Sequence, residues 1–197
     1  MKQMATHVAA PVVDRIRYFS DLPEALGEFQ YVVGTTARRG NSNLRIAMVK
    51  PREMAQTVAE LSGNNEIALV FGPEDRGLTN RELQLCQLLV SIPTSDRFRS
   101  LNLSHAVMIL CYEIFTASLA GTESFSPRLA TSGELEDMYA HLKETLIKID
   151  FLWKENPDHR LIAIRRFLSR VRLLSKDVKI IRGICRQLDW FAGKQKS

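Results

Sequence analysis

The sequence predicts an α/β protein with a mainly parallel sheet, followed by a small helical extension. Up to about residue 120, short apolar runs alternate with segments of helical periodicity, which is the pattern of a parallel sheet. Residues 121–133 (GTESFSPRLATSG) have the composition of a linker. Beyond them only helical periodicity remains. We therefore expect an α/β domain over 1–120, a linker over 121–133 and a basic helical extension over 134–197.

The N-terminal third of the chain predicts two strands between short helices. Proline and serine residues set the expected boundaries, because proline is tolerated only in the first turn of a helix and serine is a favoured cap. The expected elements are the end of a helix at 1–10, broken by Pro11, a strand at 15–19, a helix capped by Ser20 with Pro23 in its first turn, a strand at 31–33, and a helix across 52–61 between Pro51 and Gly63.

The stretch from 67 to 83 contains the clearest strand of the chain. The run IALVF at 67–71 is short and rich in β-formers, which predicts a buried strand. It ends in the loop GPEDRG. The next residues, TNRE at 79–82, form a capping box, so a short helix is expected to start at Asn80.

A second strand and a long helix follow. The run LLVSI at 88–92 is broken by Pro93 and predicts a strand, and an apolar helix is expected from about Leu103 through Phe115. The loops after both strands can meet at the carboxyl edge of one sheet. Open α/β sheets bind their ligands at that edge.

The helical extension is expected to contain three helices, the first over about 134–148. In the other two, apolar residues recur at helical spacing. These residues are Leu161, Ile164, Leu168 and Val171, and then Val178, Ile181, Cys185 and Leu188.

Composition places the chain among globular proteins with a hydrophobic core. Its 197 residues are 45% hydrophobic and 25% charged, and no apolar run approaches the roughly 20 residues of a membrane helix. Residues 1–10 lack the apolar core of a signal peptide. Cys86, Cys111 and Cys185 are odd in number and have no CxxC spacing. We therefore expect reduced core thiols in a cytoplasmic protein.

Several classes of enzyme are excluded by missing patterns. His7, His105, His141 and His159 do not have metal-ligand spacing, so we expect no metal. His105 lies in an apolar helix, where a buried and hydrogen-bonded histidine is expected. The chain has neither GxxxxGK[ST] nor GxGxxG after a strand, which argues against a phosphate-loop NTPase and a conventional dinucleotide enzyme.

Positive charge is concentrated in the helical extension. The net charge is +5, yet residues 1–140 carry 13 Lys and Arg against 16 Asp and Glu, whereas residues 141–197 carry 14 against 6. Each basic side chain on its own is explained equally well by a solvated helix face. For the stripe as a whole we favour contact with an RNA backbone. Its members are Arg165, Arg166, Arg170 and Arg172 on one helix and Lys179, Arg182 and Arg186 on the other.

Three segments together resemble a known family. They are VGTTAR at 33–38, FGPEDRGLTNREL at 71–83, and SLNLSHAV at 100–107, which follows a strand ending in Ile-Pro. They resemble motifs of the SPOUT methyltransferases, within them the TrmH/SpoU branch, and most of all the TrmJ-type tRNA 2′-O-ribose methyltransferases. The resemblance extends to about Trp190. It implies a trefoil knot in the sheet domain, which general topology rules would argue against.

The resemblance also implies a cofactor, S-adenosylmethionine, and a set of site residues. Glu74, Ser100, Asn102 and Arg38 would be catalytic. The alternatives are that Glu74 is a turn residue facing water and that Asn102 caps the following helix, a role compatible with shaping the cofactor loop. The residues expected to line the cofactor are Thr35, Thr36, Ala37, Gly72, Ile92, Ser100 and Leu101.

The loop after the first site strand is basic. Arg38 and Arg39 are expected to bind the phosphate of the target nucleotide, and a solvated loop is the alternative. Related chains often carry a further arginine where this chain has Gly40. Arg39 can compensate for it.

A homodimer is expected from the helix that starts near Leu103. This helix is apolar nearly all round, so it must be buried on several sides. Intramolecular burial is the alternative. The family pairs its subunits through the knot region, which favours the homodimer.

One motif of the family has no match in this sequence. Its first motif, N-x-G-x-x-x-R, supplies an arginine that activates the ribose hydroxyl, and the nearest string, GNSNLR at 40–45, lies in another loop. We expect a shortened N-terminus, strand edges that need cover, and turnover reduced by about 10²- to 10⁴-fold.

Taken together, the motifs predict an S-adenosylmethionine-dependent 2′-O-methyltransferase of RNA ribose. The resemblance implies tRNA, at nucleotide 32 on the edge of the anticodon loop. Two alternatives remain: a ribose methyltransferase of rRNA or of another tRNA position, and a catalytically impaired dimeric RNA-binding module.

Overall fold

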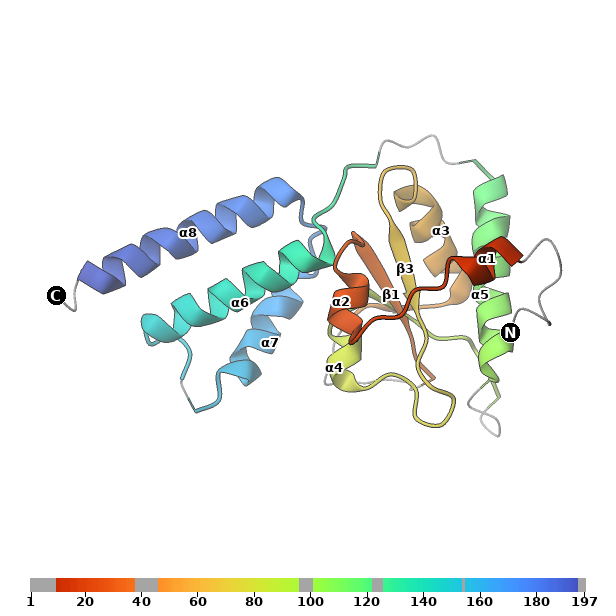
Figure 1. Ribbon diagram of the computed structural model, residues 1–197, viewed down its shortest axis with the longest axis horizontal. Coiled ribbons are helices and arrows are strands. Elements are labelled where there is room, and N and C mark those ends of the chain that lie inside the picture. Colours follow the sequence, from red (N-terminus) through yellow and green to blue (C-terminus); the bar gives the residue numbers. More distant parts are fainter. Residues whose placement is uncertain (1–9, 38–45, 96–100, 122–125, 154, 195–197) are drawn as a thin grey trace.

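The computed structural model describes residues 10–37, 46–95, 101–121, 126–153 and 155–194. A sheet-containing body lies beside a three-helix extension (Figure 1). Within the described residues the sheet has four strands in the order β2-β4-β1-β3, and every neighbouring pair is parallel. The strands are β1 (Tyr31–Thr35), β2 (Met48–Val49), β3 (Ile67–Val70) and β4 (Leu88–Val90). The predicted parallel α/β sheet is therefore confirmed.

Strand β1 lies in the middle of the body and is covered on both faces. Val32 and Val33, which point to opposite faces, are both 0% exposed. On one face Val33 packs with residues of α3 (Pro51–Leu61) and with Leu110 of α5 (Leu103–Leu119). On the other face Val32 packs with α2 (Leu22–Leu26) and α4 (Asn80–Leu83). Such double burial is typical of a parallel sheet.

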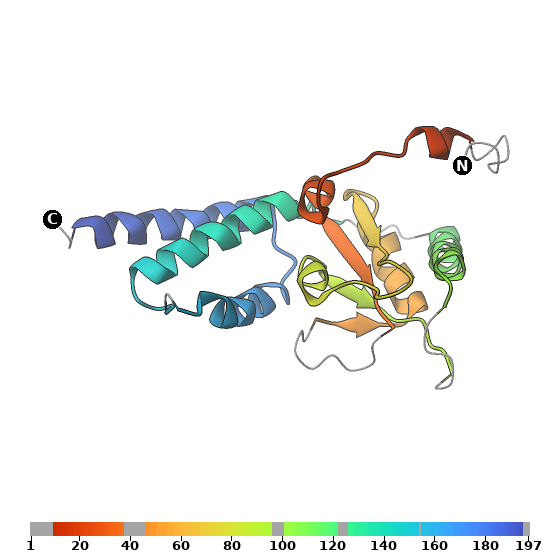
Figure 2. The same cartoon turned by 60° about the horizontal axis from the view of Figure 1, so that its bottom comes forward.

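The helical extension is fastened to the body at the start of α6 (Ser132–Lys148). The Ser132 amide donates to the Phe29 carbonyl at 2.7 Å, and the Gly133 amide donates to the Gly27 carbonyl at 3.0 Å. Helices α6 and α8 (Ser175–Lys194) run side by side (Figures 1 and 2), and α7 (Pro157–Leu168) completes the extension. Between α6 and α8, Asp189 accepts from His141 at 2.9 Å and from Lys148 at 3.0 Å.

The segment that we predicted as a linker is packed against the body where it is described. The side chain of Asn65, which is 7% exposed, donates to the Pro127 carbonyl at 3.1 Å and accepts from the Leu129 amide at 2.8 Å. Leu129 also forms an isolated antiparallel bridge with Leu174. The body and the extension are thus tied by hydrogen bonds on both sides of the junction.

Several expectations near the N-terminus are wrong. Pro11 does not break a helix but lies within the described helix α1 (Ala10–Asp14). Residues 15–19 form no strand, and Asp21, not Ser20, caps α2 by accepting from the Glu24 amide at 2.9 Å. The two-residue strand β2 was not predicted, because so short a strand has no detectable alternation. Residues 1–9 lie outside the described part of the chain.

Helix α5 differs from the expectation in its burial. Within one chain only Leu110 of this helix is buried, because α5 lies at the side of the body and packs on α3 along one stripe. His105 and Cys111 are exposed, so the predictions of a core histidine and of a core thiol at 111 are wrong. Cys86 and Cys185 are buried as expected. Among the described residues no helix is both long enough and apolar enough to cross a membrane.

The close packing of Gly34 in β1 generates a stability prediction. A Cβ at position 34 would lie 2.6 Å from Cys86 Sγ and 3.1 Å from a Leu89 methyl carbon. We expect Gly34→Ala to lower the free energy of unfolding by about 1 to 3 kcal/mol in urea titrations, because the core is overpacked. In a Cys86→Ala background this cost should shrink by about 1 kcal/mol, since the sulfur is gone. Additive effects of the two substitutions would contradict this account.

Candidate active site

A cavity of about 290 Å³ opens at the carboxyl edge of the sheet, where β1, β3 and β4 end. We call it the carboxyl-edge cavity. The parallel pairing of β1 with β3 and β4 places the three following loops next to one another. The lining residues are 35–37, 71–78, Val90, Ile92, Thr94, Leu101, Leu103 and Ala106. The loops therefore converge as an open α/β sheet requires.

The structure brings together most of the residues expected to line a cofactor. Six of the seven lie around this one cavity, although they come from three separate segments of the chain. They are Thr35, Thr36, Ala37, Gly72, Ile92 and Leu101. The seventh, Ser100, lies outside the described residues, as do Arg38 and Arg39. The cofactor-binding role of all seven stays a prediction.

Gly72 is required by the shape of its own loop. A Cβ at this position would overlap the backbone of Gly77 and Leu78, because the loop doubles back on itself. The Gly77 amide donates to the Pro73 carbonyl at 2.8 Å, and Gly77 has a φ of 64°, in the left-handed region that favours glycine. Gly72 and Gly77 thus permit a tight loop at the cavity wall.

Glu74 joins two of the loops. Its carboxylate Oε1 accepts a hydrogen bond from the Leu103 amide at 3.0 Å, at the first turn of α5. The N-terminus of a helix carries partial positive charge and unpaired N–H groups, so a carboxylate is favourable there. Although Glu74 is exposed, it therefore has a defined partner. The alternative that it only faces water does not hold in this structure.

Asn102 caps α5, as the alternative reading expected. Its Oδ1 accepts from the Ser104 amide at 2.9 Å and from the Ser104 hydroxyl at 2.6 Å. Together with Glu74 it satisfies two of the amides at the start of α5, those of Leu103 and Ser104, that have no partner within the helix. Any direct role of Asn102 in chemistry stays a prediction.

Sequence reasoning overlooked part of the cavity wall. Thr94, Asp75, Arg76 and Ala106 also line it. Each lies within a few residues of a strand end or a motif position, and that proximity was the available signal. The arrangement offers backbone groups, threonine hydroxyls and the start of α5, which is held by Glu74. These groups suit the binding and orientation of a polar ligand. Within the described part of the chain no three His, Cys, Asp or Glu residues lie together as a metal site would require.

The basic stripe of the extension does not line the carboxyl-edge cavity. Arg165 is paired with Glu136, to which its guanidinium donates two hydrogen bonds, and lies 4.2 Å from the Tyr139 ring centroid. Arg166 and Arg170 line a second cavity at the opposite edge of the sheet. On α8, Lys179 and Arg186 are exposed, and Arg182 is half-buried.

The link between Glu74 and α5 predicts a stability difference between neighbouring carboxylates. We expect Glu74→Ala to lower the free energy of unfolding by about 0.5 to 1 kcal/mol, because the helix loses both a charge and an acceptor. Glu74→Gln keeps an acceptor and should cost less. Asp75→Ala, at the exposed neighbouring position, is the control. Urea titrations measure all three, and an equal cost for Asp75→Ala would contradict the assignment.

Comparison with known proteins identifies the family. Residues 4–112 match the SpoU rRNA Methylase family, and residues 133–197 match the C-terminal domain of the tRNA methyltransferase TrmJ. The chain is 41% identical over 189 residues to the tRNA (cytidine/uridine/adenosine-2'-O-)-methyltransferase TrmJ of Pseudomonas aeruginosa, covering 89% of this chain and 73% of that protein. It is 34% identical over 176 residues to the tRNA (cytidine-2'-O-)-methyltransferase TrmJ of Methanocaldococcus jannaschii, covering 88% and 75%.

A solved structure agrees with this relationship. The crystal structure of TrmJ from Z. mobilis superposes with a TM-score of 0.76 at 26% identity, covering 93% of this chain and 80% of that chain. The similarity therefore includes both the sheet-containing body and the helical extension. The chain belongs to the SpoU rRNA Methylase family, in the branch that carries the TrmJ C-terminal domain.

Proposed function

We propose that this chain transfers a methyl group from S-adenosylmethionine to a ribose 2′-hydroxyl of tRNA at the carboxyl-edge cavity. The observation that carries the proposal is the gathering of six motif residues from three loops around one cavity. The relatives from Pseudomonas aeruginosa and Methanocaldococcus jannaschii are named as tRNA 2'-O-methyltransferases, which supports tRNA as the substrate. Within tRNA we propose nucleotide 32, at the edge of the anticodon loop, as the target.

The residues of the cavity fit the proposed cofactor. When bound, S-adenosylmethionine would supply an electrophilic methyl group for the ribose 2′-oxygen, with S-adenosylhomocysteine as the leaving group and release of the hydroxyl proton. Thr35 ends β1, Thr36 and Ala37 follow it along the cavity wall, and the glycines of the 72–77 loop allow close approach. Positioning of donor and acceptor by such fixed loops can supply much of the rate.

Glu74 and Asn102 are proposed as positioning residues. They hold the start of α5, and with it Leu101 and Leu103, against the cavity. Arg38 and Ser100 are proposed as the groups nearest the reacting hydroxyl, and Arg39 as a phosphate contact, on the family motifs alone. The trefoil knot implied by those motifs belongs to the same proposal. It is supported by the order of the strands, in which β4 lies between β1 and β2.

The basic stripe is proposed to bind the RNA backbone. Its members outside the Arg165–Glu136 ion pair are Arg166, Arg170, Arg172, Lys179, Arg182 and Arg186. Arg165 is bound to Glu136 and stacks on Tyr139, so we assign it a structural role instead. A bidentate arginine–carboxylate pair is among the stronger charged contacts.

Methyl transfer is tested directly on RNA. We expect this chain, incubated with S-adenosylmethionine carrying a labelled methyl group and unmodified tRNA, to produce one 2′-O-methylated nucleoside that mass spectrometry of digests identifies. A tRNA whose position 32 already carries the methyl group should accept no label. Labelling of rRNA but not tRNA would favour an rRNA enzyme. RNA binding without any labelling would favour a catalytically impaired RNA-binding module.

Cofactor binding is tested without RNA. We expect calorimetry to detect S-adenosylmethionine and S-adenosylhomocysteine binding that a metal chelator does not change. Gly72→Ala should weaken binding by about 10- to 100-fold, because the loop must move away from Gly77 and Leu78. Gly63→Ala is the matched control, since a Cβ there meets nothing within 4 Å. Binding heat that disappears with the chelator would contradict the metal-free site.

We also propose that the chain forms a homodimer through α5. One face of this helix is an unpaired apolar surface, on which Met108 is 68% exposed and Phe115 61% exposed. Exposed apolar patches of this kind mark interaction surfaces. The residues of this face are Leu103, Val107, Met108, Tyr112, Phe115 and Leu119.

The dimer predicts a concentration-dependent mass. Sedimentation at micromolar concentration should give about twice the 22.4 kDa of one chain. Met108→Asp should shift the equilibrium to the monomer, because it would bury an unpaired charge. Val12→Asp, at an apolar position 71% exposed outside α5, is the control and should leave the mass unchanged. A single-chain mass for the unmodified protein would contradict the proposal.

A further inference from the structure

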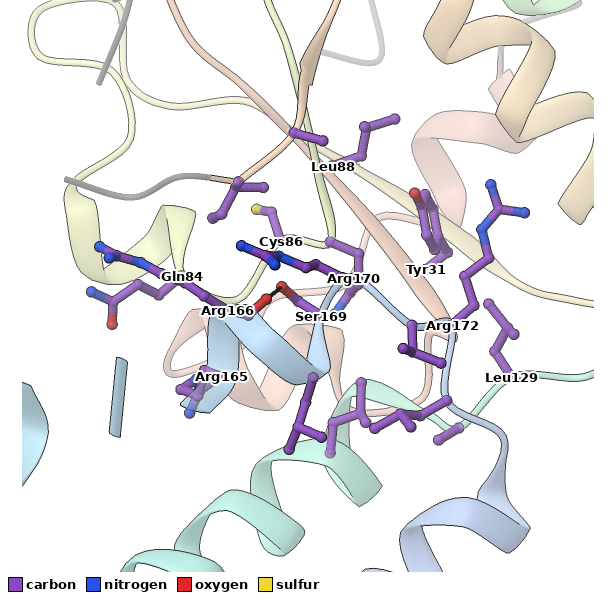
Figure 3. Close-up of a pocket in the computed structure, with 18 of the residues that line it drawn as sticks. Tyr31, Gln84, Cys86, Leu88, Leu129, Arg165, Arg166, Ser169, Arg170 and Arg172 are labelled. Carbon is purple, nitrogen blue, oxygen red and sulfur yellow. Dashed lines mark hydrogen bonds between the residues drawn. The ribbon is translucent and has the colours of Figure 1, made fainter. Parts of the chain in front are cut away.

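A second cavity, of about 430 Å³, lies between the amino edge of the sheet and the helical extension (Figure 3). We call it the arginine cleft. Its sheet wall includes Tyr31 and Cys86, and its helical wall includes Arg166, Arg170 and Arg172, where α7 leads into α8. Tyr31 begins β1, whereas the carboxyl-edge cavity starts at the other end of the same strand.

The charge of the arginine cleft is uncompensated. Among the described residues that line it, Glu136 is the sole carboxylate, and it is bound to Arg165. In the part of the chain that the structure describes, no carboxylate pairs with Arg166, Arg170 or Arg172. Three guanidinium groups at one cavity create a strong positive potential, which favours an anion.

One of these guanidinium groups carries a direct sign of a missing partner. The Nε of Arg166 is buried and has no hydrogen-bond partner among the described residues. A buried donor without a partner costs about 1 to 3 kcal/mol, so a water, an ion or a ligand oxygen is expected to accept from it. The planar fork of arginine fits the oxygens of a phosphate in a bidentate manner.

The sheet wall contributes a neutral donor. Tyr31 is 6% exposed, and the Arg172 guanidinium carbon lies 6.0 Å from its ring centroid. Burial raises the pKa of the Tyr31 hydroxyl, and the Arg172 charge offsets only part of that effect. The hydroxyl therefore stays protonated at neutral pH and can donate to an anion.

We propose that the arginine cleft binds a backbone phosphate of the RNA substrate. The inference rests on the proposed function, in that it takes RNA as the ligand. Arg170 and Arg172 are exposed at the rim, so a continuous RNA strand can enter the cleft and leave it. Tyr31 and Thr35 are four residues apart along β1, about 13 Å at the usual strand rise. The bound phosphate therefore belongs to a different nucleotide from the one that is methylated, and it anchors the RNA at the opposite edge of the sheet.

The test compares RNA affinity as a function of salt. Arg170→Gln combined with Arg172→Gln removes two exposed guanidinium groups without disturbing the buried Nε of Arg166. Arg15→Gln combined with Arg17→Gln removes the same charge from the exposed segment near α1, far from the extension (Figure 2), and is the control. Fluorescence anisotropy with unmodified tRNA measures the slope of log K against log salt for each protein, and thermal unfolding verifies that each variant is folded.

We expect the cleft variant to lose about 10- to 30-fold in affinity at 150 mM salt and to reduce the slope by about 1 to 2, since each phosphate contact contributes about 0.7 to 0.9. The control variant should match the unmodified protein. An unchanged slope for the cleft variant, an equal loss in the control, or no RNA binding by the unmodified protein would each overturn the proposal.

Two further measurements distinguish this proposal from the binding of a free anion and from the proposed methyl transfer. Calorimetry with inorganic pyrophosphate tests a free anion: pyrophosphate binding lost in the cleft variant, together with an unchanged RNA slope, would overturn RNA as the ligand. Mass spectrometry of methylated nucleosides tests the proposed function independently. If the cleft variant has a reduced salt slope but the unmodified protein methylates no RNA, RNA binding at the arginine cleft is supported and the proposed methyl transfer is contradicted. If the unmodified protein methylates tRNA but the cleft variant has an unaltered salt slope, the proposed methyl transfer is supported and RNA binding at the arginine cleft is contradicted.

Discussion

The position of β1 between β4 and β3 is the constraint on which the rest of the structure depends. Its first four residues are buried and only Thr35, at its end, is half-buried. Both of its neighbours, β3 and β4, run parallel to it. Three strand ends therefore meet at one edge. The carboxyl-edge cavity lies there because the loops after Thr35, Val70 and Val90 all begin at this edge.

The loops at that edge are held by contacts that sequence distance would not suggest. Glu74 accepts from the Leu103 amide across 29 positions of the chain, and Thr36 donates from its amide to the Val90 carbonyl at 3.0 Å. These bonds connect three loops that otherwise share no secondary structure. Such bonds hold the described parts of the cavity wall together, which favours catalysis by positioning.

The helical extension uses its positive charge in two different ways. Arg165 is bound to Glu136 and stabilises the contact between α7 and α6, whereas Arg166, Arg170 and Arg172 line a cleft without a carboxylate partner of their own among the described residues. The hydrogen bonds of Ser132 and Gly133 to Phe29 and Gly27 fix this cleft against the amino edge of the sheet. The two cavities therefore lie at opposite ends of one buried strand.

The sequence alone determined the parallel α/β class and the presence of three strands, expected at 31–33, 67–71 and 88–92 and found at 31–35, 67–70 and 88–90, because buried strands and capping boxes are local signals. Three motif segments also indicated the family. The Thr79–Glu82 capping box was predicted and both of its hydrogen bonds are present. The tertiary structure decided the rest. Local patterns could not tell that Asp21 caps α2 in place of Ser20, that α5 buries only Leu110, or that Arg165 has a carboxylate partner while the buried Nε of Arg166 has no partner among the described residues. Burial and pairing depend on which distant side chain arrives at a surface, and no periodicity of a single segment contains that information.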